Sequence, residues 1–179
     1  DMGLGKTVCA TIIGVDRLLE GAFTNLVLCP PVIIPQWHKW LASLELDVMS
    51  YCGDPREREE LLKRKFDADF CIMSMNIFRD DFKTIRTILK EKNIHLIIDE
   101  ANPVKSHKGK THKKVKLLQG TTGGMTLLTG TPMHSPEDAY GYIKLITPDV
   151  YRTRGQFDRI HVEVKDKYNR AVRYDNMDL

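Results

Sequence analysis

The chain has 179 residues, 42% of them hydrophobic, which suffices for one α/β core and is too short for two full domains of that kind. Lys and Arg number 27 against 24 Asp and Glu, so the net charge is only +3 and a nucleic-acid surface would have to come from local clustering. Four widely spaced cysteines without a CxxC pair argue against a zinc site or a disulfide framework and predict reduced thiols: Cys9, Cys29, Cys52 and Cys71.

The chain opens inside a glycine-rich loop, Asp1–Thr7 (DMGLGKT). A loop of this kind follows a buried strand, and position 1 is not Met, so we expect a piece of a longer polypeptide. No apolar run approaches the roughly 18 residues that cross a bilayer, and the N-terminus lacks a basic-then-apolar signal pattern. These features predict a soluble, cytosolic protein.

Apolar runs then alternate with helical patterns. Helical spacing predicts helices over Thr7–Leu19 (on Val8, Ile12, Val15 and Leu19), from Pro35 onward and around Phe82–Leu89, with a mixed-charge surface helix at Pro55–Lys65. Unbroken aliphatic runs predict buried strands at Leu26–Cys29, Phe70–Met73, Leu96–Asp99 and Met125–Thr129, with Val48–Tyr51 as a weaker fifth. This alternation predicts an α/β fold with a mostly parallel sheet and helices on both faces.

The opening loop carries phosphate-binding chemistry. Gly3 and Gly5, on either side of Leu4, let backbone N–H groups approach phosphate oxygens, Lys6 supplies a cation, and the Thr7 hydroxyl can hold Mg²⁺. The following helix points its positive end at the same anion. The alternative interpretation is a glycine-rich turn that opens a helix with an exposed lysine.

Two carboxylates, Asp99 and Glu100, follow the third buried run. Ligands of open α/β sheets bind at the carboxyl ends of strands, so this position favours a catalytic pair over a solvated strand edge. Asp99 would hold Mg²⁺, and Glu100 would orient and deprotonate the attacking water.

A third polar element, Thr129, Gly130 and Thr131, follows the last predicted strand. It is either an ordinary turn or a link that relays the state of Asp99 and Glu100 to another surface.

A basic stretch from position 105 to position 116 contains no acidic residue. A solvated helix face and a surface for DNA phosphates are both open interpretations. The candidates for phosphate contact are Lys110, Lys113 and Lys114.

Together these segments resemble the Swi/Snf-type family of superfamily 2 helicase-like ATPases. The resemblance rests, in order, on DMGLGKT, LCPPVIIPQW (Leu28–Trp37), DEAN (Asp99–Asn102) with Lys105 after it, and LLTGTP (Leu127–Pro132) followed by Pro136–Pro148. It covers nearly the whole chain.

The resemblance implies a RecA-like first lobe over residues 1–150 and a connector over 151–179 toward an absent second lobe, with ATP-driven movement along double-stranded DNA. It implies that Gly3, Leu4, Gly5, Lys6 and Thr7 bind the nucleotide, that Thr7 and Asp99 hold Mg²⁺, and that Glu100 is the catalytic base. It further implies coupling through Asn102, Thr129, Gly130 and Thr131, and DNA contacts near Pro30, Pro31 and Ser74. Pro30, Pro31 and Trp37 match the motif that frames a DNA-contacting loop in the family. They are alternatively a rigid turn and a core aromatic.

Two departures from the family pattern bear on function. Asn102 stands where the family usually has His, and an amide can hydrogen-bond but cannot titrate. The second lobe, which supplies arginine fingers in the family, is absent, so this chain alone is expected to hydrolyse ATP poorly or not at all.

Three alternatives remain: a restriction-type translocase, a strand-separating helicase, and a nucleotide-gated DNA-binding module without hydrolysis. The compact motif spacing predicts a phage or bacterial source and hence the cytoplasm, whereas a eukaryotic source would place the protein in the nucleus.

Overall fold

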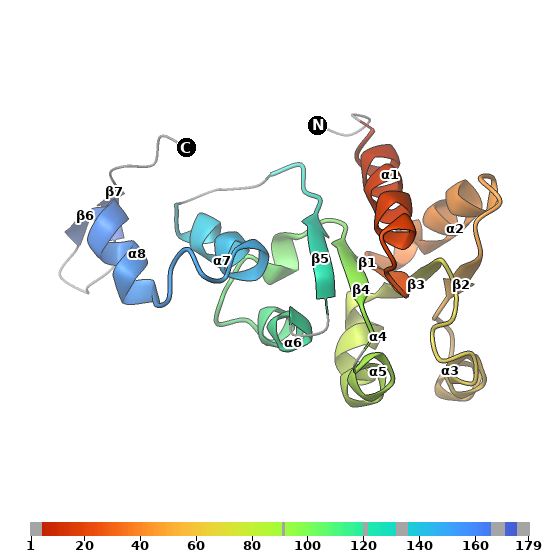
Figure 1. Cartoon of the computed structure of the whole chain (residues 1–179). Coiled ribbons are helices and arrows are strands. Elements are labelled where there is room, and N and C mark those ends of the chain that lie inside the picture. The colour runs from red at the N-terminus through yellow and green to blue at the C-terminus, as the bar shows by residue number, and fades with distance from the viewer. Residues whose placement is uncertain (1–4, 91, 120–121, 132–135, 166–170, 175–179) are drawn as a thin grey trace.

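The structure is a computed structural model that describes residues 5–90, 92–119, 122–131, 136–165 and 171–174 (Figure 1). A parallel five-stranded sheet in the order β2-β3-β1-β4-β5 forms its centre. These strands are β1 (Thr24–Cys29), β2 (Val48–Ser50), β3 (Phe70–Ser74), β4 (Ile94–Ile98) and β5 (Thr122–Leu127). A separate antiparallel pair joins β6 (Val162–Lys165) to β7 (Ala171–Tyr174).

Helices cover both faces of the sheet, as Figure 1 shows. One face packs against α1 (Lys6–Leu19) and α2 (Ile34–Ala42), and the other packs against α3 (Pro55–Leu62), α4 (Met75–Asp80), α5 (Phe82–Leu89), α6 (Lys110–Leu118) and α7 (Pro136–Ile146). Alternate residues of a strand contribute to two hydrophobic cores, one on each face, because successive side chains of a strand point to opposite faces. In β1, Val27 and Cys29 enter the first core and Leu26 and Leu28 enter the second. The predicted three-layer fold is therefore confirmed.

Helix α1 spans the predicted residues but packs through an unexpected face. Its buried residues are Ala10, Thr11 and Gly14, whereas Ile12 and Leu19 are exposed. The helix lies so close to the sheet that a Cβ on Gly14 would come within 2.7 Å of the Phe70 ring. Only small residues fit on this face of α1, because the close approach to the sheet leaves no room for larger side chains.

Strand β5 is not the fully buried strand that we predicted at Met125–Thr129. It runs over Thr122–Leu127, and most of its side chains are half-buried. Among the described residues β5 pairs only with β4, so it forms an edge of the sheet. An edge strand has one neighbour instead of two, which explains its greater exposure.

The region after position 150 begins with a packed helix, α8 (Arg154–His161). Phe157 is buried, and its ring centroid lies 5.3 Å from that of Tyr140 in α7. The Tyr151 hydroxyl lies 2.7 Å from His161 Nε2 and ties the start of this segment to the end of the helix. The first part of the predicted connector therefore packs against α7. No helix of the described segments is both long and apolar enough to cross a membrane.

Candidate functional site

Asp99 and Glu100 leave the sheet directly after β4, at its carboxyl edge. The Asp99 N–H donates to Leu28 O at 2.8 Å, and the Ala101 N–H donates to Leu128 O at 2.9 Å, so the acidic pair lies between the ends of β1 and β5. Glu100 adopts a left-handed backbone conformation with φ of 52°. Such a conformation costs a non-glycine residue roughly 1–3 kcal/mol and is found preferentially at functional sites. The backbone thus turns sharply at the residue predicted to be the base.

The Asp99 carboxylate is held by two directed hydrogen bonds. Trp37 Nε1–H donates to Asp99 Oδ2 at 2.9 Å, and the Glu100 backbone N–H donates to Asp99 Oδ1 at 2.9 Å. The residue is only 6% exposed. Burial, and then the charge of Asp99, raise the pKa of the neighbouring Cys29 thiol to about 12, so Cys29 remains a neutral thiol at this site. The carboxylate is therefore oriented from two sides.

A cavity of about 210 Å³ opens beside this pair. Its lining comes from the ends of β1, β3 and β4: Cys29, Pro30, Pro31, Met75, Asn76, Asp99, Glu100 and Pro103. The two prolines of the predicted DNA-contacting segment thus lie at the same cavity as the predicted catalytic carboxylates.

The described part of the phosphate loop begins at Gly5, while Gly3 and Leu4 lie outside the described residues. Gly5 precedes α1 with φ of 73°, which favours glycine, and a Cβ there would meet nothing within 4 Å. No side chain caps this helix end. Its first N–H groups have no partner within the helix, so they suit an anion such as phosphate. Lys6 and Thr7 form the first turn beside that end.

The two halves of the predicted site share an edge of the sheet, and in the described residues Thr7 and Asp99 line different hollows. Lys6 is not among the residues around the Asp99 cavity, and Thr7 lines a separate hollow of about 390 Å³ with Val8 and residues of α2. The C-terminus of α1 leads through Gly21 to the start of β1, so its N-terminus points to the carboxyl edge. A single cleft around Lys6, Asp99 and Glu100 stays a prediction, because Gly3 and Leu4 beside Lys6 lie outside the described residues.

The donor atoms present suit Mg²⁺ held together with a nucleotide. Among the described residues, no group of three or more His, Cys, Asp or Glu side chains is gathered as a metal site. Mg²⁺ in nucleotide sites usually takes one or two protein oxygens, substrate phosphates and water. Asp99 offers carboxylate oxygens that each accept one hydrogen bond and retain a lone pair, and Thr7 offers a hydroxyl. Both are hard oxygen donors of the required kind.

Asn102 links the acidic pair to the segment after β5. Its Nδ2 donates to Thr131 Oγ1 at 3.3 Å, and the Thr131 backbone N–H donates to Thr129 Oγ1 at 3.2 Å. The Asn102 Oδ1 atom is shielded from solvent and accepts no hydrogen bond from the described part of the chain. Three of the four predicted coupling residues are thus connected in a chain of contacts, with Gly130 exposed between the two threonines.

The family model of the SNF2-related domain matches residues 1–174. The chain belongs to the SNF2-related domain family. A solved structure, the Sulfolobus solfataricus SWI2/SNF2 ATPase core in complex with dsDNA, superposes with a TM-score of 0.74 at 26% identity and covers 90% of this chain and 33% of that one. The predicted Swi/Snf-type family and RecA-like fold class are confirmed.

Curated relatives of this SNF2-related domain are far longer than the chain. It is 29% identical over 150 residues to TATA-binding protein-associated factor MOT1 of Saccharomyces cerevisiae, covering 75% of this chain and 8% of that protein. It is 28% identical over 170 residues to ATP-dependent DNA helicase DDM1 of Arabidopsis thaliana, covering 88% and 21%. It is 27% identical over 177 residues to human SWI/SNF-related matrix-associated actin-dependent regulator of chromatin subfamily A member 1, covering 88% and 16%. These eukaryotic relatives give no support to the predicted phage or bacterial source.

In the basic stretch of this SNF2-related domain, some side chains are exposed and others contact neighbouring residues of the protein. Lys110 and Lys113 are exposed on α6. Lys114 instead donates to Arg79 O and lies with its Nζ 5.2 Å from the centroid of the Phe82 ring. His112 is buried and its Nδ1 lies 2.8 Å from Val104 O. Lys114 therefore packs against α4 and α5, which argues against a phosphate contact by this lysine.

Ser74, the last predicted DNA contact, is buried at the end of β3. Its hydroxyl accepts from the Ile77 N–H at 3.2 Å and caps α4. A DNA contact by this side chain stays a prediction, and its observed role is to start the helix that follows.

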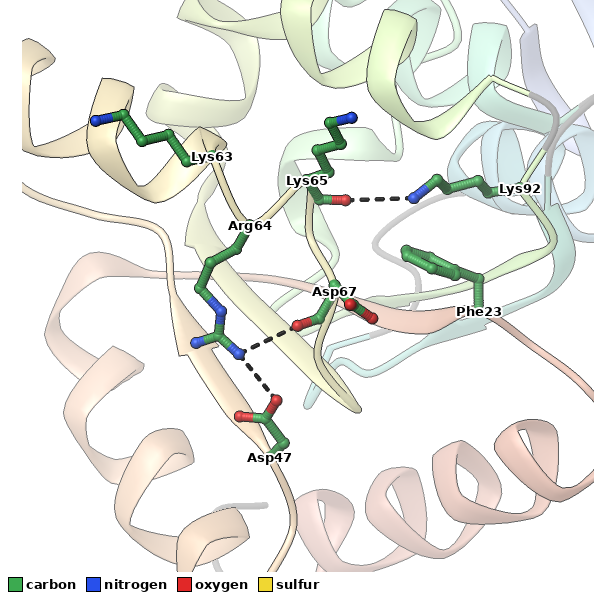
Figure 2. Close-up of a pocket in the computed structure, with 7 residues that line it drawn as sticks. All are labelled: Phe23, Asp47, Lys63, Arg64, Lys65, Asp67 and Lys92. Carbon is green, nitrogen blue, oxygen red and sulfur yellow. Dashed lines mark hydrogen bonds and ion pairs between the residues drawn. The ribbon is translucent and has the colours of Figure 1, made fainter.

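A larger and basic hollow lies at the opposite, amino edge of the sheet (Figure 2). It measures about 580 Å³ and is lined by residues next to the strand starts: Phe23, Asp47, Lys63, Arg64, Lys65, Asp67 and Lys92. Arg64 donates to Asp47 Oδ2 at 2.8 Å, and Lys92 Nζ lies 3.5 Å from the centroid of the Phe23 ring. No residue of the predicted site lies there.

The contact at this site that the sequence did not predict is made by Trp37, which we expected to frame a DNA-contacting loop or to fill the core. Its hydrogen bond to Asp99 joins residues 62 positions apart. The available signal was chemical, because a buried tryptophan needs an acceptor for its N–H.

Proposed function

We propose that this SNF2-related domain is the first ATPase lobe of a motor that uses ATP to move along double-stranded DNA. The observation that carries the proposal is the oriented pair of Asp99 and Glu100 at the carboxyl end of β4, linked through Asn102 to Thr131. The helix terminus at Gly5 supports nucleotide binding at the same edge of the sheet.

In this proposal each group has a distinct role. The first turn of α1, with Lys6 and Thr7, binds the phosphates of ATP, and Asp99 with Thr7 holds Mg²⁺, which neutralises the phosphate charge when bound. Glu100 accepts the proton of the attacking water. The second lobe of the same polypeptide completes the site, so the isolated 179-residue chain is weakly active or inactive.

Exposed lysines and a solved relative support the DNA part of the proposal. Exposed Lys110 and Lys113 suit phosphate contacts, and the solved relative is an ATPase core in complex with dsDNA. The names of the relatives refer to chromatin and to the TATA-binding protein, which favours the nuclear alternative over the cytoplasmic one.

The roles of Lys6 and Glu100 are separable by experiment in the full-length protein. Glu100→Gln keeps the size and most hydrogen bonding but removes the base, so we expect near-normal ATP binding and a loss of DNA-stimulated hydrolysis of about a hundredfold or more. Lys6→Ala is expected to lose hydrolysis together with ATP binding. Binding of a fluorescent ATP analogue and steady-state phosphate release measure the two effects. Unimpaired hydrolysis by Glu100→Gln would exclude its role as the base.

A further inference from the structure

Helix α2 touches the candidate site at two points, through the only two tryptophans of the chain. Trp40 Nε1–H donates to Thr11 Oγ1 at 3.0 Å, and the Thr11 hydroxyl donates to Thr7 O at 2.8 Å. One turn earlier in α2, Trp37 Nε1–H donates to Asp99 Oδ2. The same helix therefore contacts the phosphate-binding helix α1 and the acidic pair after β4.

Trp37 is held in place more firmly than a surface side chain would be. It is 1% exposed and packs among buried residues of the α2 face, including Ile34, Leu41 and Ile72. A buried indole has no freedom to follow a moving partner, so its N–H defines where the carboxylate oxygen must lie. The bond is charge-assisted and hence stronger than one between neutral groups.

The bond also bears on Glu100. Asp99 uses its other oxygen to accept the Glu100 N–H, at the residue with φ of 52°. Because Trp37 fixes one carboxylate oxygen, it fixes the direction in which the second one is presented. Loss of the indole N–H would release both the Asp99 carboxylate and the turn at Glu100.

We propose that Trp37 is a positioning residue that orients Asp99 for metal binding through its indole N–H. The inference rests on the proposed function, since it concerns how Asp99 holds Mg²⁺ with ATP. Partners that orient a metal ligand typically change metal affinity by tenfold to a hundredfold when they are removed. A tryptophan that only filled the core would act through its shape and not through its N–H.

The experiment separates the N–H from the shape of the ring in the full-length protein. Trp37 is replaced by benzothienylalanine, which keeps the bicyclic ring but has sulfur in place of N–H, and in a second variant by Phe. Leu41→Ala is the matched control, because Leu41 is fully buried in the same helix and the same core cluster but its side chain has no hydrogen-bond donor. The readouts are the Mg²⁺ dependence of binding of the fluorescent analogue mant-ATP and the melting temperature.

We expect the benzothienylalanine protein to melt close to wild type and to need about tenfold more Mg²⁺ for half-maximal mant-ATP binding. The Phe variant should show a similar shift with a lower melting temperature, and Leu41→Ala should lower the melting temperature without the shift. An unchanged Mg²⁺ midpoint in the benzothienylalanine protein would overturn the inference, even if the Phe variant shifted. Absence of Mg²⁺-dependent mant-ATP binding in the wild type would instead contradict the proposed function.

Discussion

The two edges of the central sheet both carry charged hollows, but they are built differently. At the carboxyl edge, Asp99 is buried and oriented by Trp37 and the Glu100 N–H. At the amino edge, the larger hollow in Figure 2 is lined by four cationic side chains and two carboxylates, and the ion pair between Arg64 and Asp47 is largely exposed. Exposed pairs contribute typically less than about 1 kcal/mol.

The difference shows that neither size nor charge identifies the candidate site. The smaller hollow contains the oriented and desolvated carboxylate, and it lies where the strands of a parallel sheet leave their ends open to ligands. The amino edge has charge without comparable organisation. Changes at the two edges should therefore have very different effects on ATP turnover.

The largest expected difference comes from removing one carboxylate at each edge. Asp99→Asn in the full-length protein should weaken Mg²⁺-ATP binding and lower the rate of hydrolysis by roughly a hundredfold or more, because the metal-binding charge is lost. Asp47→Asn, the same chemical change at the amino edge, should leave ATP turnover unchanged. Steady-state ATPase rates for both variants check this. Equal losses would mean that the two edges do not differ in the way proposed.

A smaller effect is expected from a row of hydrogen-bonded polar side chains that runs across strands β1, β4 and β5. His95 Nδ1 lies 2.8 Å from Asn25 Oδ1, and His95 Nε2 lies 3.0 Å from Thr126 Oγ1. Asn25 uses its Nδ2 to donate to Gly14 O and Asp69 O, so its oxygen must accept from a neutral imidazole with the proton on Nδ1. Burial, and then the charge of Arg17, lower the pKa of His95 to about 4.

This lowered pKa predicts the sign of a pH effect on stability. Between the folded pKa of about 4 and the unfolded value near 6.5, His95 is protonated in the unfolded chain but neutral in the folded protein. The contribution of His95 to the free energy of unfolding is therefore fully present above pH 6.5 and is lost as the pH falls through this range. The free energy of unfolding should drop by about 2 kcal/mol from this residue between pH 7 and pH 5. Denaturant unfolding at the two pH values measures it, and His95→Gln should flatten the dependence. An unchanged pH dependence in that variant would contradict the assignment.

Coupling between the acidic pair and the segment after β5 should give a further, smaller effect. Asn102→Ala removes the hydrogen bond to Thr131 without touching Asp99. We expect DNA stimulation of ATP hydrolysis to fall about tenfold, a change of about 1.4 kcal/mol, with basal hydrolysis retained. The ratio of rates with and without duplex DNA is the measurement. A matching fall in basal rate would point to damage at the acidic pair instead of lost coupling.

The smallest effect concerns DNA binding by exposed lysines. Lys110→Ala with Lys113→Ala should reduce the salt dependence of binding to a short duplex by about one slope unit for each lost contact. Lys63→Ala with Lys65→Ala removes the same charge at the amino edge and should leave the slope unchanged. Lys114→Met should also leave the slope unchanged, because this lysine packs on α5. Equal changes of slope for both pairs would indicate general charge attraction.

The sequence predicted what depends on local patterns. Periodicity located α1, α5 and the central strands, and the acidic pair falls at a strand end as expected. It did not predict which face of α1 packs, because Gly14 allows a close approach that hydrophobicity alone does not reveal. It also treated the basic stretch as one surface, whereas His112 is buried against Val104 and Lys114 contacts Arg79, 35 positions earlier in the chain.

The exposure of β5 and the partner of Trp37 could not be predicted for the same reason. Both depend on which strands and helices lie side by side, and that is set by tertiary packing. A run such as Met125–Thr129 has the composition of a buried strand wherever it lies in the sheet. Its position at the edge becomes known only from the strand order.

The most direct test of the account is ATP turnover by the full-length wild-type protein, measured with and without double-stranded DNA in the presence of Mg²⁺. If the carboxyl edge is the ATPase site of a DNA motor, duplex DNA should increase the steady-state rate several-fold or more, and Glu100→Gln should abolish that increase. A wild-type protein that binds ATP and DNA but shows no DNA-stimulated turnover would contradict the motor and would favour a nucleotide-gated DNA-binding module.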